Sequence, residues 1–133
     1  MVARILVIED NAANLELVRY LLAFTGYTVL EAHNGELGLA MAREERPDLI
    51  ICDLQMPLLD GYGVLAQLRA DPGGDAVVIV ALTAFSMAND EQLVMAAGFN
   101  GYLSKPIEPE KFVGQISAYL PPALRLSRPW ASG

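Results

Sequence analysis

Two residue types that build many catalytic and metal sites are nearly missing from this chain of 133 residues, which has one cysteine and one histidine. Cys52 has no partner for an internal disulfide, and a single histidine excludes a multi-histidine metal centre. The chain has no apolar run of about 18 residues, so we expect no membrane-spanning segment. The first ten residues hold one basic residue and reach an acid by Glu9, which argues against a secretory signal. We therefore expect a cytoplasmic protein.

Basic residues are also scarce. Nine Lys and Arg against sixteen Asp and Glu give 9 − 16 = −7. Nucleic-acid binding needs a basic surface, so we expect no nucleic-acid partner. Two of the nine basic residues, Arg125 and Arg128, lie after residue 122, where there is no acid. The rest of the chain therefore carries 7 − 16 = −9, which favours a monomer in solution.

The length suits one domain. A chain of this size can bury roughly two-thirds of its unfolded surface, so it needs no disulfide or metal to fold. We predict a domain over residues 1–121 and a flexible C-terminal tail over residues 122–133, because proline interrupts regular structure there. The alternatives for the tail are a linker from a longer protein and a partner-binding segment anchored by Trp130.

Short apolar runs alternate with segments of helical spacing. Strands are predicted over residues 5–8, 27–30, 49–52, 77–82 and 101–104, and the intervening segments predict amphipathic helices, one of them over about residues 87–97. This (βα)₅ alternation favours an α/β fold, a parallel sheet with helices on both faces. In such a sheet the functional site lies at the carboxyl ends of the strands.

Polar residues follow four of these strands. Three carboxylates at one edge repel each other, by on the order of 4 kcal/mol per pair at about 4 Å and an effective dielectric of about 20. One lysine cannot offset this repulsion, whereas Mg²⁺ is the natural complement of a small carboxylate site. The strand-end residues are Glu9 with Asp10, Asp53, Thr83 with Ala84, and Lys105 with Pro106.

A carboxylate beside Mg²⁺ and a lysine is a good phosphoryl acceptor. Asp53 can attack in line and become an acyl phosphate, while Lys105 neutralises phosphoryl oxygens. The Thr83 hydroxyl and the Ala84 amide can bind the other oxygens. A flavin mononucleotide site, the main rival on this topology, would need phosphate-binding amides where the chain has Glu9 and Asp10.

The motifs in their order and spacing resemble the receiver domain of two-component response regulators. They are Glu9-Asp10-Asn11, residues 53–57, Gly61, Thr83-Ala84 and Lys105-Pro106, and the resemblance covers about residues 3–120. Residues 83–87 and 102–107 are most similar to single-domain regulators of the DivK type. The resemblance implies a doubly wound, three-layer fold of the CheY-like (flavodoxin-like) class, with strand order 2-1-3-4-5.

The resemblance also implies a role for each motif residue. Asp53 accepts a phosphoryl group from a histidine kinase or a histidine phosphotransfer protein. Asp10, Asp53 and the backbone carbonyl of Gln55 bind Mg²⁺, and Glu9 joins directly or through water. Glu9 stands where many members have Asp, so its longer side chain should shift the metal geometry. Lys105 pairs with the phosphoryl group, and its bond to Pro106 is expected to be cis.

Thr83 and Tyr102 are the implied switch pair. Phosphorylation adds about −1.5 to −2 charge, Thr83 moves toward it, and Tyr102 rotates into the vacated space. The change alters the face of the fourth helix, fifth strand and fifth helix, through which we expect contact with a downstream protein, or weak pairing of two copies. Bulky Phe85, two residues after Thr83, should obstruct the attacking water and slow self-hydrolysis.

Three other functions remain as alternatives. A phosphatase that forms a phosphoaspartate needs a second acid two residues after the nucleophile, and the chain has Gln55 there. A receiver domain excised from a hybrid histidine kinase is the second, although a methionine close to the first strand favours a free-standing protein. The third is an interaction module that acts unphosphorylated, against which the set of Asp10, Asp53, Thr83 and Lys105 argues. We expect a signalling protein whose only catalysis is its own phosphoryl transfer and slow autodephosphorylation.

Overall fold

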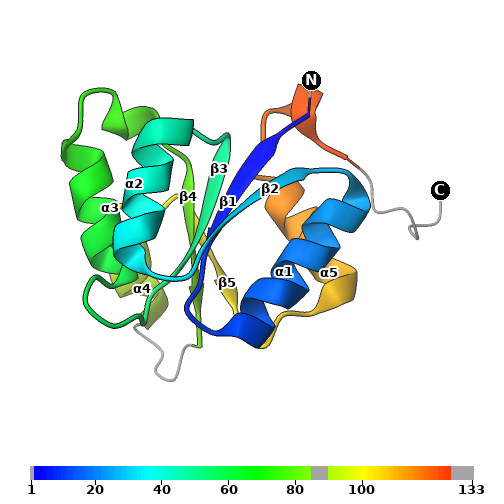
Figure 1. Cartoon of the computed structure of the whole chain (residues 1–133), viewed down its shortest axis with the longest axis horizontal. Coiled ribbons are helices and arrows are strands. Elements are labelled where there is room, and N and C mark those ends of the chain that lie inside the picture. Colours follow the sequence, from blue (N-terminus) through cyan, green and yellow to red (C-terminus); the bar gives the residue numbers. More distant parts are fainter. Residues whose placement is uncertain (1, 85–89, 127–133) are drawn as a thin grey trace.

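The computed structural model describes residues 2–84 and 90–126, in which five strands alternate with five α-helices (Figure 1). The strands are β1 (Arg4–Ile8), β2 (Thr28–Ala32), β3 (Leu49–Asp53), β4 (Ile79–Thr83) and β5 (Gly101–Ser104). The helices are α1 (Ala12–Thr25), α2 (Gly35–Glu45), α3 (Gly61–Ala70), α4 (Asp90–Ala97) and α5 (Pro109–Ser117), with 3₁₀ turns η1 (Gly74–Ala76) and η2 (Pro122–Leu124). The predicted (βα)₅ alternation is confirmed.

All strand pairs in the sheet are parallel, and their order is β2-β1-β3-β4-β5, as predicted. The order reverses between β1 and β3, so the loops that follow these two strands diverge to opposite sides and leave a crevice at their carboxyl ends. The register pairs Ile8 with Cys52, and Thr83 with Ser104. The residues that follow these strands therefore meet at one edge of the sheet.

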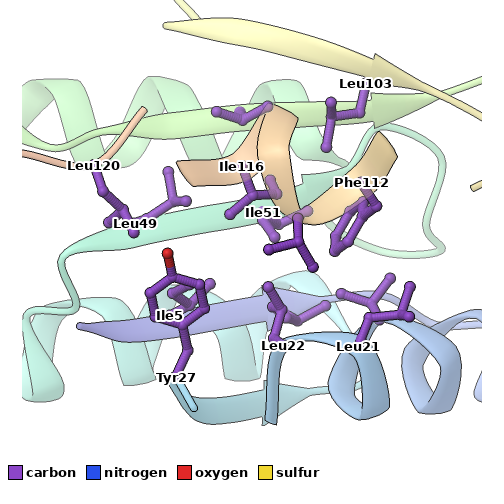
Figure 2. Packing of buried hydrophobic residues seen from close by; sticks show 14 of the residues in the cluster. Ile5, Leu21, Leu22, Tyr27, Leu49, Ile51, Leu103, Phe112, Ile116 and Leu120 are labelled. Carbon is purple, nitrogen blue, oxygen red and sulfur yellow. The ribbon is translucent and has the colours of Figure 1, made fainter. Parts of the chain in front are cut away.

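The sheet separates two hydrophobic cores. Side chains of α1 and α5 cover one face, as Figure 2 shows for Leu22 and Phe112. Helices α2, α3 and α4 cover the other face, which Figure 1 shows as a separate layer. Every residue of β3 and β4 is buried. Because both faces of the central strands are covered, these strands read as continuous apolar runs rather than as alternating ones.

Three helices begin with a side-chain cap at the carboxyl edge of the sheet. Asn11 accepts the backbone N–H of Asn14 at 2.9 Å, and Asn34 accepts that of Leu37 at 2.7 Å. Asp60 accepts the N–H of Gly63 at 2.8 Å. These caps satisfy N–H groups that the first helical turn leaves without partners, so they fix the loops around the strand ends.

Two strands begin later than the sequence predicts. The strand predicted over residues 27–30 begins at Thr28, because the N–H of Tyr27 donates to the carbonyl of Leu22 at the end of α1. The strand predicted from residue 77 begins at Ile79, because Val77 closes the η1 turn with its N–H on Gly74. Residues 87–89 of the predicted fourth helix lie outside the described part of the chain.

Residues 122–126, which open the predicted tail, lie against the domain. The N–H of Leu126 donates to the Tyr27 hydroxyl at 2.8 Å, and that hydroxyl shares a hydrogen bond of 2.7 Å with Ser117. Arg125 donates to the carbonyl of Leu120 at 2.9 Å. The rest of the tail, with Arg128 and Trp130, lies outside the described residues. Among the helices that are described, none is long and apolar enough to cross a membrane.

Candidate functional site

Three carboxylates meet at the carboxyl ends of β1 and β3. Glu9 and Asp10 follow β1 directly, and Asp53 is the last residue of β3. One oxygen from each lies within 4.8 Å of the others. Glu9 is 0% exposed and Asp53 is 4% exposed, whereas Asp10 lies at the surface. The predicted acidic cluster is therefore present, and it is open to solvent on the Asp10 side.

Lys105 supplies a positive charge to this cluster. It follows β5, and its backbone N–H donates to the carbonyl of Thr83 at 2.8 Å. Its Nζ lies 3.3 Å from Glu9 Oε1 and 3.2 Å from Asp53 Oδ1. The peptide bond to Pro106 is cis, as expected. Partial burial alone would lower the pKa of Lys105, but the negative charges of Glu9 and Asp53 raise it.

Glu9 is a buried carboxylate whose negative charge is poorly stabilised by its surroundings. Neither of its oxygens receives a hydrogen bond of good geometry from the described residues. Burial raises the pKa of Glu9 from 4.5 to about 7, and the neighbouring Asp53 carboxylate adds to the rise. Asn14 and Lys105 oppose it. A buried carboxylate with so little compensation costs free energy when ionised.

The donor set fits a hard divalent cation. Such a cation prefers carboxylate and carbonyl oxygens, and Mg²⁺ keeps several of its own waters. The two buried oxygens of Glu9, which receive no hydrogen bond from the described residues, are the kind of group that a cation would compensate. Asp53 and the exposed Asp10 would hold the cation, and Glu9 would take part directly or through a water.

A cavity of about 310 Å³ lies between the loop that follows β3, the end of β4, α3 and α4. Thr83 is the last residue of β4 and is 9% exposed, and it lines this cavity together with Ala84 and Gln55. The backbone N–H of Gln55 donates to Asp53 Oδ1 at 3.3 Å, which keeps the loop close to the carboxylate. The cavity therefore lies beside the loop that directly follows Asp53.

Gly61 allows the loop after β3 to fold tightly over the acceptor strand. A Cβ at this position would lie 2.5 Å from the carbonyl oxygen of Asp53. The N–H of Gly61 donates to the carbonyl of Leu54 at 3.0 Å. A larger residue would push α3 away from the site, which is the physical reason for a glycine in this motif.

Tyr102 lies half-buried on β5 against the core of the α3 and α4 layer. On the neighbouring strand β4, Tyr102 pairs with Ala81. Ala81 and Thr83 are two residues apart, so their side chains and that of Tyr102 project from the same face of the sheet. A hydrogen bond to Glu91 of α4 raises the pKa of Tyr102, with burial and the charge of Glu91 adding to it. Tyr102 therefore connects β5 to α4 in this conformation.

The predicted site residues thus lie at one edge, in two groups. Glu9, Asp10, Asp53 and Lys105 form the charged group, and Gln55, Thr83 and Ala84 line the adjacent cavity. Tyr102 belongs to neither group and packs against the core on β5, and Phe85 lies outside the described part of the chain.

The sequence analysis missed two features of the site. Asp60, Tyr62 and Asp90 also line the cavity. The cap pattern before Gly61 could have indicated Asp60, whereas no sequence signal joins Glu91 to Tyr102 because their contact depends on how α4 packs.

The family model of the response regulator receiver domain matches residues 5–117 of the chain. The chain belongs to this family. It is the receiver domain of a two-component response regulator, and phosphorylation and Mg²⁺ binding at an acidic site are general to such domains. Receiver domains interact in general with histidine kinases and with downstream targets.

Similar proteins include the polar-differentiation response regulators DivK of Brucella anthropi and Brucella ovis. The first is 38% identical over 116 residues, which cover 87% of this chain and 94% of that protein. The second is 36% identical over 120 residues, or 90% of this receiver and 98% of the relative. The predicted likeness to DivK-type regulators is confirmed.

Solved structures agree on the fold. The chemotaxis response regulator CheY4 of Vibrio cholerae has a TM-score of 0.84 at 29% identity and covers 90% of this receiver and 100% of its own chain. The receiver domain of a sensor histidine kinase from Pseudomonas aeruginosa has a TM-score of 0.81 at 32% identity, over 90% of this receiver and 98% of that chain. That structure holds a magnesium ion in its active-site cleft.

Proposed function

We propose that this receiver accepts a phosphoryl group on Asp53 from a phosphohistidine protein, with Mg²⁺, and signals by protein contact. The observation that carries the proposal is the contact of Lys105 with both Glu9 and Asp53 inside a cluster of three carboxylates. The phosphodonor would be a histidine kinase or a histidine phosphotransfer protein. The module is a phosphoacceptor rather than an enzyme acting on other substrates.

The transfer is an in-line displacement at phosphorus. An oxygen of Asp53 forms the new P–O bond as the P–N bond of phosphohistidine breaks, and the imidazole leaves with the bonding pair and takes up a proton. Lys105 neutralises charge on the transferring group. The Thr83 hydroxyl and the Ala84 amide, at the cavity wall, donate hydrogen bonds to its other oxygens. The product is an aspartyl phosphate.

Mg²⁺, when bound, supplies positive charge that offsets the carboxylates and the phosphoryl oxygens. Asp10, Asp53 and the carbonyl of Gln55 would hold it, with Glu9 directly or through water. The oxygens of Glu9, which receive no hydrogen bond from the described residues, support this assignment. Glu9 and Asp10 would not accept the phosphoryl group themselves: with Asp53 they would hold the cation, whose positive charge would favour the ionised form of the acceptor carboxylate.

The response to phosphorylation would begin at Thr83. Its hydroxyl moves toward the new oxygens, and Tyr102 leaves Glu91 and turns inward. This rearrangement changes the face formed by α4, β5 and α5, where Leu93 and Met95 are exposed. A downstream protein would bind there, and the chain would act as a monomer or pair weakly through the same face.

A receiver domain of a hybrid kinase is the second candidate. The comparison that favours it is the similarity to receiver domains of histidine kinases from Syntrophus aciditrophicus and Pseudomonas aeruginosa. Both candidates share the chemistry at Asp53. They differ in the donor, because a hybrid kinase phosphorylates its own receiver within the same polypeptide.

The test is the intact mass of the protein after incubation with acetyl phosphate, with and without Mg²⁺. Wild type should gain one phosphate only with Mg²⁺, and Asp53→Ala should gain none. Asp60→Ala is the matched control, because Asp60 lines the neighbouring cavity and caps α3 without joining the acidic cluster. It should still be phosphorylated.

Two results would contradict the proposal. Phosphate on Asp53→Ala would place the acceptor elsewhere, and peptide mapping would locate it. An unmodified wild type that also fails to accept phosphate from a phosphorylated histidine phosphotransfer domain would indicate a receiver that acts without phosphate.

A further inference from the structure

Another cavity lies at the edge of the sheet formed by the amino ends of the strands, opposite the edge that holds Asp53. It has a volume of about 550 Å³ and is bounded by the end of α2, the end of α3 and the turn that follows α3. Figure 1 shows the end of α2 and this turn, in green, at the end of the sheet away from the loops after β1 and β3. Sites for small molecules usually measure about 300 to 1,000 Å³, so this cavity has the size of a ligand site.

The lining of this cavity is mostly apolar. Ile50 of β3, Leu68 of α3 and Ala42 of α2 line it, and all three are buried members of the core on this face of the sheet. Further apolar side chains come from the segments before β3 and β4 and after α3, namely Pro47, Val77 and Pro72. An apolar group that enters the cavity leaves water, which favours binding.

Arg46 gives the cavity a positive charge that the described neighbours do not neutralise. It lines the cavity and is exposed, and the described residues give its side chain no hydrogen bond or ion pair. Its backbone is left-handed, with φ 48° and ψ 62°, at the position that ends α2. Glycine is the usual residue in this conformation, because a Cβ makes it less favourable. The chain therefore has an arginine beside an apolar cavity, against the local backbone preference.

A second arginine of the cavity already binds a carboxylate. Arg43 donates two hydrogen bonds to Asp71, from Nε to Oδ2 at 2.8 Å and from Nη2 to Oδ1 at 3.1 Å. The planar guanidinium and the planar carboxylate match each other in such a pair. Both residues line the cavity, and their opposite charges offset each other. Arg46 is therefore the lining arginine that is available to a ligand.

One available arginine suits a ligand with one negative charge. The chain has a net charge of −7, so a polyanion such as a nucleotide would be repelled by the rest of the protein. A monocarboxylate is repelled much less. It can form with Arg46 the two parallel hydrogen bonds that Asp71 forms with Arg43. The apolar lining requires that the rest of the ligand be apolar.

We propose that the cavity between α2 and α3 binds a small organic acid, with its apolar body inside the cavity and its carboxylate on Arg46. The ligand contacts both helices and stabilises the folded protein by mass action. The residues of this site do not include Asp53 or the other residues of the acidic cluster. Binding therefore does not depend on the proposed phosphorylation.

The test uses 2-naphthoate, an apolar bicyclic monocarboxylate, as the probe. Its binding at neutral pH is followed by the backbone amide shifts of the full chain in proton–nitrogen correlation spectra. Amides of the carboxyl edge should not shift. The neutral alcohol 2-naphthalenemethanol has the same apolar body and should bind about fivefold more weakly, because it forms no ion pair. The largest shifts are expected at lining residues, such as Ala42, Leu68, Ala76 and Val77.

Arg46→Ala should weaken the binding of 2-naphthoate about fivefold and leave that of the alcohol unchanged. Arg46→Glu should reverse the preference, so that protonated 2-naphthylmethylamine binds better than 2-naphthoate. Because Arg46 is exposed, both variants should fold, and thermal unfolding verifies this.

Two control variants should bind 2-naphthoate like wild type. Arg19→Ala is the matched control, because it removes the same charge from α1, which covers the other face of the sheet. Asp53→Ala removes the proposed phosphoryl acceptor and leaves the cavity intact. The failure of either proposal can therefore be recognised without the other.

Four results would overturn the proposal. No shifts with millimolar 2-naphthoate would mean that the cavity does not accept a ligand of this class. Shifts that gather away from the lining residues would place the probe elsewhere. Equal affinities for the acid and the alcohol in wild type would mean that the cavity does not recognise a carboxylate. Equal weakening in Arg46→Ala and Arg19→Ala would show that the net charge of the protein, rather than Arg46, attracts the probe.

Discussion

The polar groups at the two edges of the sheet differ in how fully they are hydrogen-bonded. At the amino edge Arg69 donates to the carbonyls of Gly74, Val77 and Gly98 and to the side chain of Asn100, at 2.6 to 3.0 Å. At the carboxyl edge the buried Glu9 has two oxygens that receive no hydrogen bond from the described residues. One edge is saturated with hydrogen bonds, and the other is left short of positive charge.

This difference indicates that one edge contributes mainly to stability and the other mainly to function. A saturated network holds loops in one geometry, because losing any partner leaves another polar group buried and unpaired. A site whose negative charges are poorly stabilised lowers the stability of the fold. The same site binds a positively charged ligand more favourably, because the ligand supplies the missing charge. The amino edge therefore holds the fold together, and the carboxyl edge is ready for a cation and a phosphoryl group.

The largest effect on stability is expected from breaking the amino edge. Arg69→Ala removes four hydrogen bonds from a charged donor and should lower the free energy of unfolding by about 3 kcal/mol. Urea unfolding measures this loss. The folded fraction should still gain phosphate on Asp53 at the wild-type rate, because no bond of Arg69 reaches the carboxyl edge.

Arg46→Ala is the control for charge, since the described residues give this exposed arginine no side-chain hydrogen bond or ion pair. It should change stability by less than about 0.5 kcal/mol. Equal losses in the two variants would show that the Arg69 network does not hold the amino edge.

The next effect concerns pH at the carboxyl edge. The pKa of Glu9 is about 7 in the folded protein and 4.5 ordinarily, so between these values the folded chain keeps a proton that the unfolded chain has released. Stability should therefore fall as pH rises from about 4.5 to about 7 and stay level above that, by on the order of 2 kcal/mol in total. Thermal unfolding across this range without Mg²⁺ measures it.

The same pH profile is measured for the variant Glu9→Gln and for wild type with Mg²⁺, to assign the effect to Glu9. The variant lacks the titrating group, so the difference between wild type and Glu9→Gln isolates its contribution. Saturating Mg²⁺ should flatten the fall in wild type, because the cation stabilises the ionised carboxylate. A wild type and a variant with parallel pH profiles would mean that Glu9 titrates normally.

The smallest effect is expected at the hydroxyl of Tyr27. Tyr27→Phe keeps the ring in the core but removes the group that joins Leu126 and Ser117, and should cost about 1 kcal/mol. Amide hydrogen exchange should show faster exchange at Leu126. Tyr119→Phe is the control, because Tyr119 lies just after α5 and has no hydrogen bond to Leu126 among the described residues. Unchanged exchange at Leu126 in Tyr27→Phe would show that this hydroxyl does not hold residues 122–126 against the domain.

Local patterns were enough to predict most of the fold. The apolar runs at β1 and β3 are buried on both faces, and Asn34 and Pro109 begin helices where the sequence indicated. The boundaries of β2 and β4 were predicted less well. There, hydrogen bonds of the preceding turn compete with the strand ladder, and the residue types on either side do not reveal which one prevails.

The sequence by itself determined which chemical groups stand at the strand ends, because parallel strands bring their carboxyl ends to one edge whatever the details of packing. Acids after β1 and β3 and a lysine after β5 therefore predicted the charged group of the site. Only the tertiary structure decided how these groups are compensated. Whether the buried Glu9 receives a hydrogen bond, whether Tyr102 meets Glu91, and whether Leu126 reaches Tyr27 each depend on distances between different elements, which side-chain packing sets.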